Sequence, residues 1–400
     1  MKLADVATFV VGNPPPSFGG RYFVFVKLTT EDGIVGYGEV YAGSFHPQVV
    51  SEMVQDVADR TLIGESPFDI ERFWRRAYSR GFTQRPDVSL QGVMSGLEMA
   101  CWDIMGKALD QPVYNLLGGR VHERLRTYTY LYPEPDDATD VYLDPDLAAQ
   151  RAVEEVERGF TALKFDPGGP YTAMGGHQPS MDRIALAVEF LRKIRTAVGN
   201  SADLLFGTHG QFTAAGAIRL ASRIEEFDPL WFEEPTPPDD LAGMARVASR
   251  TSVPIAAGER LTTKVEFARL LEAGAVSIVQ PNLGRAGGIL EGKKIAAIAE
   301  SHNAQLAPHL YCGPIVGAAN IQLATCSPNL LLLEGIRDWG GFHAELLETP
   351  VEWERGYVIP PTAPGLGVTL NEEVARAHPY EGDVLHLEMA DQPIDEADSL

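Results

Sequence analysis

The sequence is poor in cysteine and in positive charge, and it has no long apolar run. Its 400 residues hold three widely separated cysteines, Cys101, Cys312 and Cys326, whose spacing fits neither a disulfide framework nor a cysteine metal site. The 33 basic against 55 acidic residues give a formal net charge of −22, which argues against nucleic acid or an anionic membrane as a partner. No stretch is long enough to span a bilayer, and MKLADVATFV lacks the layout of a signal peptide. We therefore expect a cytoplasmic protein with free thiols.

The first part of the chain, residues 1–125, reads as strands followed by helices. RYFVFVKLTT and IVGYGEV are β-rich runs joined by the turn signal Glu31-Asp32-Gly33. SLQGVMSGLEMACWDIMGKAL then predicts an apolar helix that ends at Asp110-Gln111-Pro112. Strands followed by helices predict a separate α+β domain.

The second part, residues 126–364, repeats a short apolar run followed by a helical segment. The eight runs are LRTYTYL, ALKFDP, DLLFGTHG, LWFEEP, PIAAGE, VSIVQP, QLAPHL and LLLEGI. Eight such units predict a (β/α)₈ barrel. A doubly wound open sheet is the alternative, but no glycine-rich phosphate motif follows the first strand, which disfavours it. The predicted fold class is thus α/β, a modified TIM barrel behind an N-terminal α+β domain.

Polar side chains follow seven consecutive strands of this predicted barrel. They are Lys164 and Asp166, His209, Glu233 and Glu234, Glu259, Gln280 and Asn282, His309, and Glu334. Because barrel strands end at one face, these groups converge, and their mutual repulsion calls for a cation. Carboxylates on adjacent strands, Glu233 and Glu259, suit Mg²⁺. Lys164 and His309 lie across the mouth from each other by strand order, an arrangement for removing a proton α to a metal-bound carboxylate.

Several motifs in this order resemble the enolase superfamily, of the mandelate racemase/muconate lactonizing enzyme type, along nearly the whole chain. They are GIVGYGEV, ACWDIMGKALDQPVYNLLGG, ALKFD, LWFEEP, AAGER, IVQPNLGRAGGI, LAPH and PGLGV. The resemblance implies an N-terminal capping domain, to which 365–400 is expected to return, and a homo-oligomer. It also implies one Mg²⁺ ion and enolisation of a small anionic carboxylate substrate. Loops at Pro14–Phe23, Gly43–Pro47 and Thr83–Asp87 are then expected to cover the mouth.

The resemblance also carries roles onto individual positions. Glu233 and Glu259 match metal ligands, and Glu334 matches the group that hydrogen-bonds the substrate carboxylate. His309 matches the general acid/base, Lys164 the first lysine of the strand-two motif, and His209 a histidine of sugar-acid dehydratases. The remaining candidates for substrate binding are Arg21, His46, Arg85, Gln280 and Asn282.

Three positions depart from the family pattern. Gly207 replaces the strand-three aspartate ligand, Asp166 stands where the second strand-two lysine is usual, and Asn282 replaces the aspartate that partners the strand-seven histidine. We hypothesise that Asp166 supplies the third metal ligand, directly or through a water; the alternative is that the site has lost its metal. A neutral Asn282 predicts a lower pKa for His309, so Lys164 becomes the first candidate base and His209 the second.

The reaction after enolisation is predicted from the loops. VGNPPPSFGGRYFVFVKLTT, FTQRPDVSL and GTHGQFT are similar to 3,6-anhydro-L-galactonate cycloisomerases, in which a ring-ether oxygen leaves and a 2-keto-3-deoxy sugar acid forms. The same groups acting on a free hydroxyl would make a sugar-acid dehydratase of the galactonate or gluconate type, the alternative. A non-catalytic sugar-acid-binding relative is the second alternative, supported by Gly207.

Overall fold

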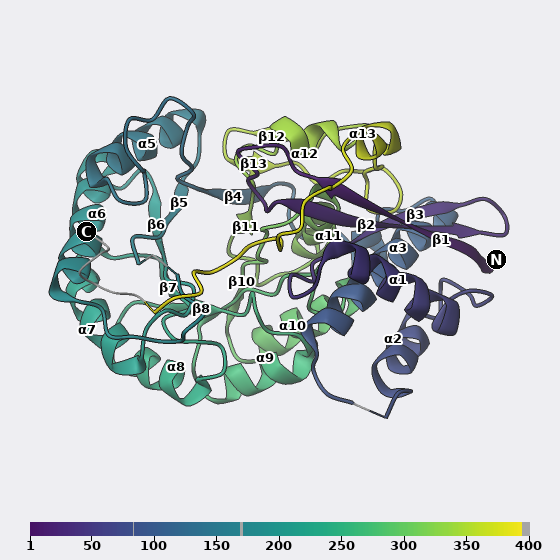
Figure 1. The fold of residues 1–400 in the computed structure, drawn as a ribbon, viewed down its shortest axis with the longest axis horizontal. Coiled ribbons are helices and arrows are strands. Elements are labelled where there is room, and N and C mark those ends of the chain that lie inside the picture. Colours follow the sequence, from purple (N-terminus) through teal and green to yellow (C-terminus); the bar gives the residue numbers. More distant parts are fainter. Residues whose placement is uncertain (83, 169–170, 394–400) are drawn as a thin grey trace.

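The computed structural model describes residues 1–82, 84–168 and 171–393. It consists of a small sheet with helices and a larger barrel beside it (Figure 1). Thr83, in one predicted capping loop, and 394–400, at the end of the segment expected to return to the cap, lie outside the described residues.

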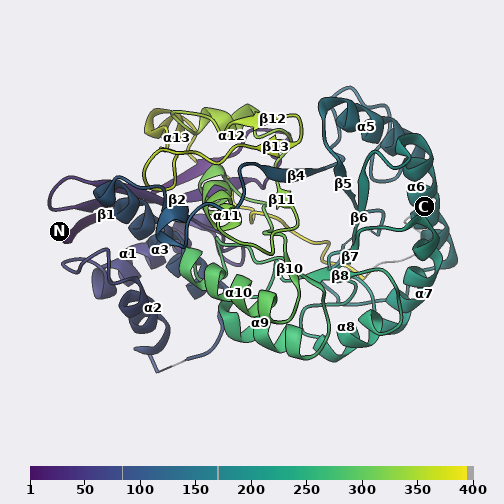
Figure 2. The same ribbon diagram turned by 180° about the vertical axis from the view of Figure 1, so that it is seen from behind.

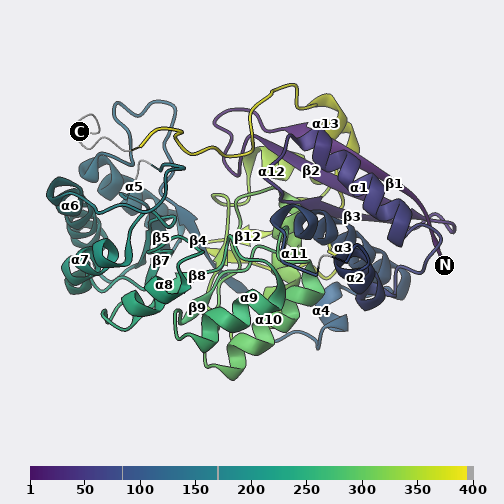
Figure 3. The ribbon, with the colours of Figure 1, turned by 60° about the horizontal axis from the view of Figure 1, so that its bottom comes forward.

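The N-terminal unit is a three-stranded antiparallel sheet covered by helices (Figure 3), as the sequence predicts. Its elements are β1 (Leu3–Gly12), β2 (Tyr22–Thr30), β3 (Val35–Val40), α1 (Pro47–Thr61), α2 (Ile70–Ser79), α3 (Val88–Leu109) and α4 (Val113–Leu116). The β2–β3 turn closes where Gly33 N–H donates to Thr30 O at 2.9 Å. The predicted helix stop is confirmed, because Asp110 takes the left-handed conformation that ends α3, with φ 53°.

The eight predicted apolar runs all form parallel strands. They are β4 (Leu125–Tyr130), β5 (Ala162–Phe165), β6 (Asp203–Gly207), β7 (Trp231–Glu233), β8 (Ile255–Ala257), β9 (Ile278–Val279), β10 (Gln305–Leu306) and β11 (Leu333–Glu334). Each of β4 to β9 pairs with the next strand in chain order, and β11 pairs with β4. A parallel bridge between Leu306 and Leu330 links β10 to the residues before β11 and completes the ring. The barrel prediction is confirmed, and the open-sheet alternative is wrong.

The barrel interior is filled by side chains from successive strands. The buried layer comprises Tyr128, Ala162, Leu205, Trp231, Ala256, Ile278, Ala307 and Leu332. Helices cover the outside (Figure 2): α5 (Pro145–Arg158), α6 (Met181–Val198), α7 (Ala214–Ile224), the short 3₁₀ helix η1 (Glu225–Phe227), α8 (Leu241–Ala248), α9 (Thr263–Glu272), α10 (Ile289–Ser301) and α11 (Pro314–Thr325). A filled interior leaves the carboxyl ends of the strands as the place for a site.

The last part of the chain pairs with the first barrel strand and then returns to the cap. Its elements are α12 (Gly341–Glu345), β12 (Trp353–Glu354), β13 (Tyr357–Val358) and α13 (Glu372–Ala377). β13 pairs antiparallel with β4, and Tyr380 N–H donates to Val10 O of β1 at 3.0 Å. Among the described residues, none of the helices combines the length and apolarity that crossing a membrane requires.

Two buried carboxylates of the cap bind the N-termini of two barrel helices. Glu39 of β3 accepts from the backbone N–H of Gly313 and Val316 at the start of α11, and Glu98 of α3 accepts from Ile289 and Leu290 at the start of α10. Helix N-termini favour negative charge, so these contacts fix the cap over the mouth. Burial nevertheless raises the pKa of each carboxyl to about 7.

Candidate active site

A cavity of about 690 Å³ opens at the carboxyl ends of the barrel strands. Its inner wall carries the ionisable groups Lys164, Asp166, His209, Glu259, His309 and Glu334. The rest of the lining is Tyr41, Tyr130, Tyr132, Asp140, Tyr142, Leu143, Tyr171, Arg183, Tyr311, Leu387, Glu388 and Met389. A volume of this size is ordinary for a small-molecule site. The structure therefore brings all four predicted catalytic residues into one cavity.

Lys164, at the end of β5, is paired with carboxylates. Its Nζ forms an ion pair with Glu233 and lies 3.7 Å from Glu334 Oε1, and its side chain is only 1% exposed. Burial by itself lowers the pKa of Lys164, but Glu233 and Glu334 outweigh it and hold that pKa well above the usual value. Lys164 is therefore a cation here, and it must leave Glu233 and lose its proton before it can accept a proton from a substrate.

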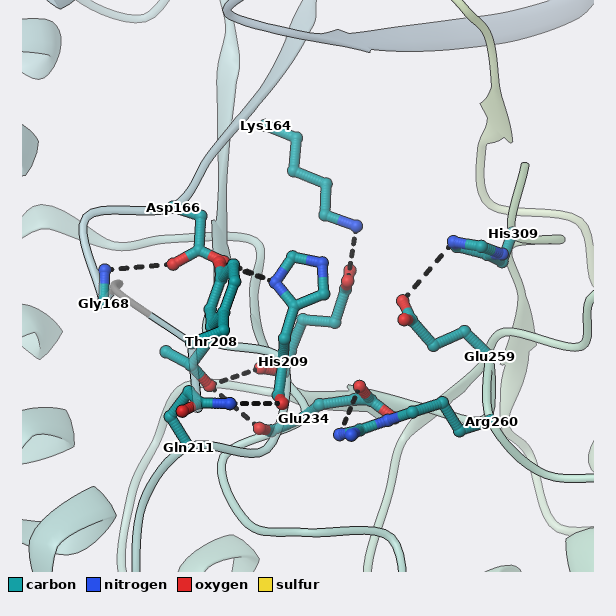
Figure 4. Close-up of polar contacts among 12 residues, drawn as sticks. Lys164, Asp166, Gly168, Thr208, His209, Gln211, Glu234, Glu259, Arg260 and His309 are labelled. Atoms are coloured by element: carbon teal, nitrogen blue, oxygen red, sulfur yellow. Dashed lines mark hydrogen bonds and ion pairs between the residues drawn. The ribbon is translucent and has the colours of Figure 1, made fainter. Parts of the chain in front are cut away.

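His209, which follows β6, is paired with Asp166 (Figure 4). Its Nδ1 lies 2.5 Å from Asp166 Oδ2 and 2.7 Å from Tyr171 Oη. An ionised carboxylate only accepts, so Nδ1 carries a proton that it donates to Asp166, and Nε2, which is protonated as well while the ring is a cation, is left for a substrate. Burial lowers the pKa of His209, but the hydrogen bond and charge of Asp166 raise it to about 9.

The backbone at His209 is strained, and neighbouring contacts hold it. His209 has φ 45°, in the left-handed region, and so has Glu234, with φ 42°. Thr208 Oγ1 donates to the backbone oxygens of Glu233 and Glu234 (Figure 4). Gly210 N–H donates to Glu234 O at 2.7 Å. Strain that is held in this way is typical of functional positions.

His309, beyond β10, has a different partner. Asn282 Nδ2 lies 2.9 Å from His309 Nδ1, and Asn282 Oδ1 accepts from Gly284 N–H at 2.8 Å, which fixes the amide orientation. An amide that donates to Nδ1 requires a neutral ring with its proton on Nε2. Nε2 lies 3.5 Å from Glu259 Oε2 (Figure 4). Burial lowers the pKa of His309 to about 4, against the opposing charge of Glu259.

The predicted metal ligands fit a hard divalent cation in part. Glu259 Oε2 is buried with no hydrogen-bond partner among the described residues, and Glu233 lies on the neighbouring strand. Asp166, by contrast, uses Oδ1 to accept from Gly168 N–H and Oδ2 to bind His209. Within residues 1–82, 84–168 and 171–393, no three His, Cys, Asp or Glu side chains form a ready metal site. Glu259 thus fits Mg²⁺ with water and substrate oxygens. Both oxygens of Glu233 are bound by Lys164 and Gln280, so Glu233 would join Glu259 only after its pair with Lys164 opens, and both oxygens of Asp166 are engaged as well.

Gly207 leaves space that Asp166 borders. A Cβ built on Gly207 would lie 3.5 Å from Asp166 Oδ2, 3.5 Å from Lys164 Cε and 3.4 Å from Tyr130 Oη. The acidic group next to the position of the missing strand-three ligand is therefore Asp166, as the sequence suggests. Its contacts direct it to His209 and not to Glu233 or Glu259.

The five residues predicted to bind substrate are absent from the described cavity lining. Arg21 forms an ion pair with Glu388, and His46 Nε2 lies 3.1 Å from Gly382 O, so both contact the C-terminal segment. Gln280 donates to Glu233 at 2.7 Å, Asn282 contacts His309, and Arg85 is exposed. These side chains support groups of the site or lie outside it, and their binding of substrate stays a prediction.

Besides Asp140, Leu143 and Arg183, the sequence analysis did not predict two groups of lining residues. One is aromatic: Tyr41, Tyr130, Tyr132, Tyr142, Tyr171 and Tyr311 all face the cavity. The other is the C-terminal run Leu387, Glu388 and Met389. The tyrosines of LRTYTYLY alternate along a strand, a signal that was available; the C-terminal run has no periodic pattern that would mark it.

Comparison with known proteins agrees with this fold. Residues 16–118 match the mandelate racemase/muconate lactonizing enzyme N-terminal domain, and residues 147–374 match the family described as enolase C-terminal domain-like. A crystal structure of a mandelate racemase/muconate lactonizing enzyme homologue from Labrenzia alexandrii DFL-11 has 62% sequence identity and a TM-score of 0.95, over 98% of this chain and 100% of that one.

Two further relatives are named as dehydratases. A D-xylonate dehydratase of Haloferax volcanii is 34% identical, over 96% of this chain and 90% of its own length. A D-galactonate dehydratase of Ralstonia pickettii is 37% identical, over 93% of both chains. The chain therefore belongs to the mandelate racemase/muconate lactonizing enzyme family of the enolase superfamily. It is an enzyme, and it resembles the galactonate-type dehydratases within that family.

Proposed function

We propose that this enzyme dehydrates a sugar acid to a 2-keto-3-deoxy sugar acid. One cavity holds three proton-transfer side chains, Lys164, His209 and His309, next to two carboxylates suited to a divalent cation. The names of the xylonate and galactonate dehydratases support loss of water, the alternative from the sequence, over the cycloisomerase prediction. The observation that carries the proposal is the Asp166–His209 pair, because elimination of a hydroxyl needs a proton donor.

The side chains divide the reaction between them. Lys164, once it has left Glu233 and lost its own proton to solvent, accepts the proton from the carbon next to the substrate carboxylate. His209 gives its Nε2 proton to the departing C3 hydroxyl, which leaves as water, and the enol becomes the 2-keto acid. His309 donates a hydrogen bond from Nε2. Mg²⁺ held by Glu233 and Glu259 would supply positive charge to stabilise the enediolate.

A substrate screen tests this proposal. Purified enzyme with Mg²⁺ is given a panel of five- and six-carbon aldonates together with a 3,6-anhydro sugar acid, and 2-keto-3-deoxy products are measured. We expect product from at least one aldonate and loss of that activity with a chelator. Product from the anhydro acid alone would establish the cycloisomerase instead, and no product from any acid would refute the proposal.

Exchange of the α-proton with solvent deuterium assigns the roles. Lys164→Met should lose both exchange and elimination, whereas His209→Asn should lose elimination and keep exchange. The reverse pattern would assign the proton acceptor to His209.

A further inference from the structure

The outer wall of the cavity is built by the end of the described chain. Leu387, Glu388 and Met389 are consecutive, and all three line the cavity. Their outer surfaces are exposed, with Leu387 at 57% and Met389 at 40%. Residues 385–392, here called the strap, run across the barrel mouth between the cap and the barrel (Figures 1 and 3).

The cap holds one end of the strap. Arg21 Nη1 donates to Leu385 O at 2.9 Å and to Glu388 Oε2 at 3.0 Å. His386 is 4% exposed, and its ring packs against Tyr41, with ring centroids 4.9 Å apart. Arg21, which the sequence suggested for substrate hydroxyls, thus positions the strap.

The loop after β5 holds the other end. Ala390 N–H donates to Tyr171 O at 3.0 Å, Ala173 N–H donates to Ala390 O at 2.9 Å, and Thr172 Oγ1 donates to Gln392 O at 2.6 Å. Tyr171 also contacts His209 through its hydroxyl. The strap is therefore fixed on both sides of the mouth. One of its attachments is the backbone oxygen of Tyr171, the residue whose hydroxyl contacts His209.

The side chain of Glu388 is oriented as well as placed. Arg21 binds Oε2, and Leu385 N–H donates to Oε1 at 3.2 Å. Asp140 and Arg183 of α6 also line the cavity, so this part of the lining presents two carboxylates and one guanidinium, while Arg21, outside the lining, is paired with Glu388. A carboxylate accepts hydrogen bonds from hydroxyl groups and repels a second carboxylate.

We propose that the strap selects the substrate by its far end, admitting aldonates and disfavouring aldarates. This inference rests on the proposed function, which places the reacting carboxylate at the inner end with Lys164 and His209. The far end of a six-carbon acid then meets Glu388. A terminal hydroxymethyl group donates to that carboxylate, whereas a second carboxylate is repelled by it.

The ratio of kcat/KM for an aldonate to kcat/KM for the matching aldarate measures this selection. Glu388→Gln removes the charge and keeps the size, so the ratio should fall by about tenfold, because like charges no longer meet. Glu381→Gln is the matched control: Glu381 is exposed, lies on the same C-terminal segment and is outside the cavity lining. Its ratio should equal that of wild type.

A second variant separates charge from wall contact. Met389→Ala should raise KM for both acids and leave the ratio unchanged; a shift as large as that of Glu388→Gln would overturn the assignment to charge. Thermal unfolding midpoints equal to wild type show that the variants fold. If the wild type is active and Glu388→Gln leaves the ratio unchanged, substrate selection by the strap is refuted and the dehydratase proposal stands. If the wild type is inert toward every acid, both proposals are refuted.

Discussion

The two histidines of the cavity sit in opposite environments. His209 faces an aspartate, which raises its pKa to about 9, and His309 faces an asparagine and is buried, with its pKa lowered to about 4. His209 carries a proton on Nδ1 because its partner accepts, and its raised pKa adds a second proton on Nε2; His309 carries its one proton on Nε2 because its partner donates. The partner side chains thus divide the roles between two otherwise identical rings.

This contrast connects the departures from the family pattern. His309 has Asn282 in place of the usual aspartate, whereas His209 is paired with Asp166, which follows β5. The His–Asp pair has in effect moved from one side of the mouth to the other. Gly207 leaves the space next to Asp166 open. The sequence hypothesis read Asp166 as a relocated metal ligand; its contacts make it a partner for His209.

Removing the proton donor should give the largest effect. In His209→Asn no side chain replaces the Nε2 proton, so elimination should slow by about a thousandfold, within the range usual for general acids. Exchange of the α-proton with deuterium, followed by NMR, should continue near the wild-type rate. Loss of exchange together with elimination would show that proton abstraction and proton donation are not divided between Lys164 and His209.

Removing the partner of His209 should give a smaller loss. In Asp166→Asn the orienting charge is gone, so elimination should slow by about 10- to 100-fold. Because Asp166 raises the pKa of His209, the variant loses its protonated donor at lower pH, and the alkaline limb of the pH–rate profile should move down.

Calorimetric titration with Mg²⁺ separates the two readings of Asp166. The affinity of Asp166→Asn should match that of wild type if Asp166 only positions His209. A large fall in affinity would restore Asp166 as the third metal ligand.

Giving His309 an acidic partner should reduce the difference between the environments of His309 and His209. In Asn282→Asp the carboxylate accepts from Nδ1–H, so Nε2 becomes free to take a proton, while Gly284 N–H keeps its acceptor. Combined with Lys164→Met, this change should raise α-proton exchange about tenfold over Lys164→Met alone, as a modest general base would. An unchanged exchange rate would show that the tautomer of His309 does not limit it.

The sequence predicts which side chains meet at the site, but not which of them pair with each other. Strand order places Lys164, His209 and His309 around one mouth, because the carboxyl ends of parallel strands share a face. Which base each carboxylate contacts depends on side-chain geometry of a few ångströms, so the choice of Asp166 between metal and His209 stays open until the fold is known. The strap escapes prediction because an irregular segment has no period and contacts residues more than 200 positions away.

The smallest expected effect concerns Tyr171, where the strap and the His209 pair meet. Tyr171→Phe removes the hydroxyl 2.7 Å from His209 Nδ1, but Asp166 still accepts that proton, so elimination should slow by only about threefold, near the value of one neutral hydrogen bond. The strap is attached to the backbone oxygen of Tyr171, which the variant keeps. The aldonate-to-aldarate ratio should therefore stay at its wild-type value. A change in that ratio would mean that the hydroxyl, and not only the backbone, connects substrate selection to proton donation.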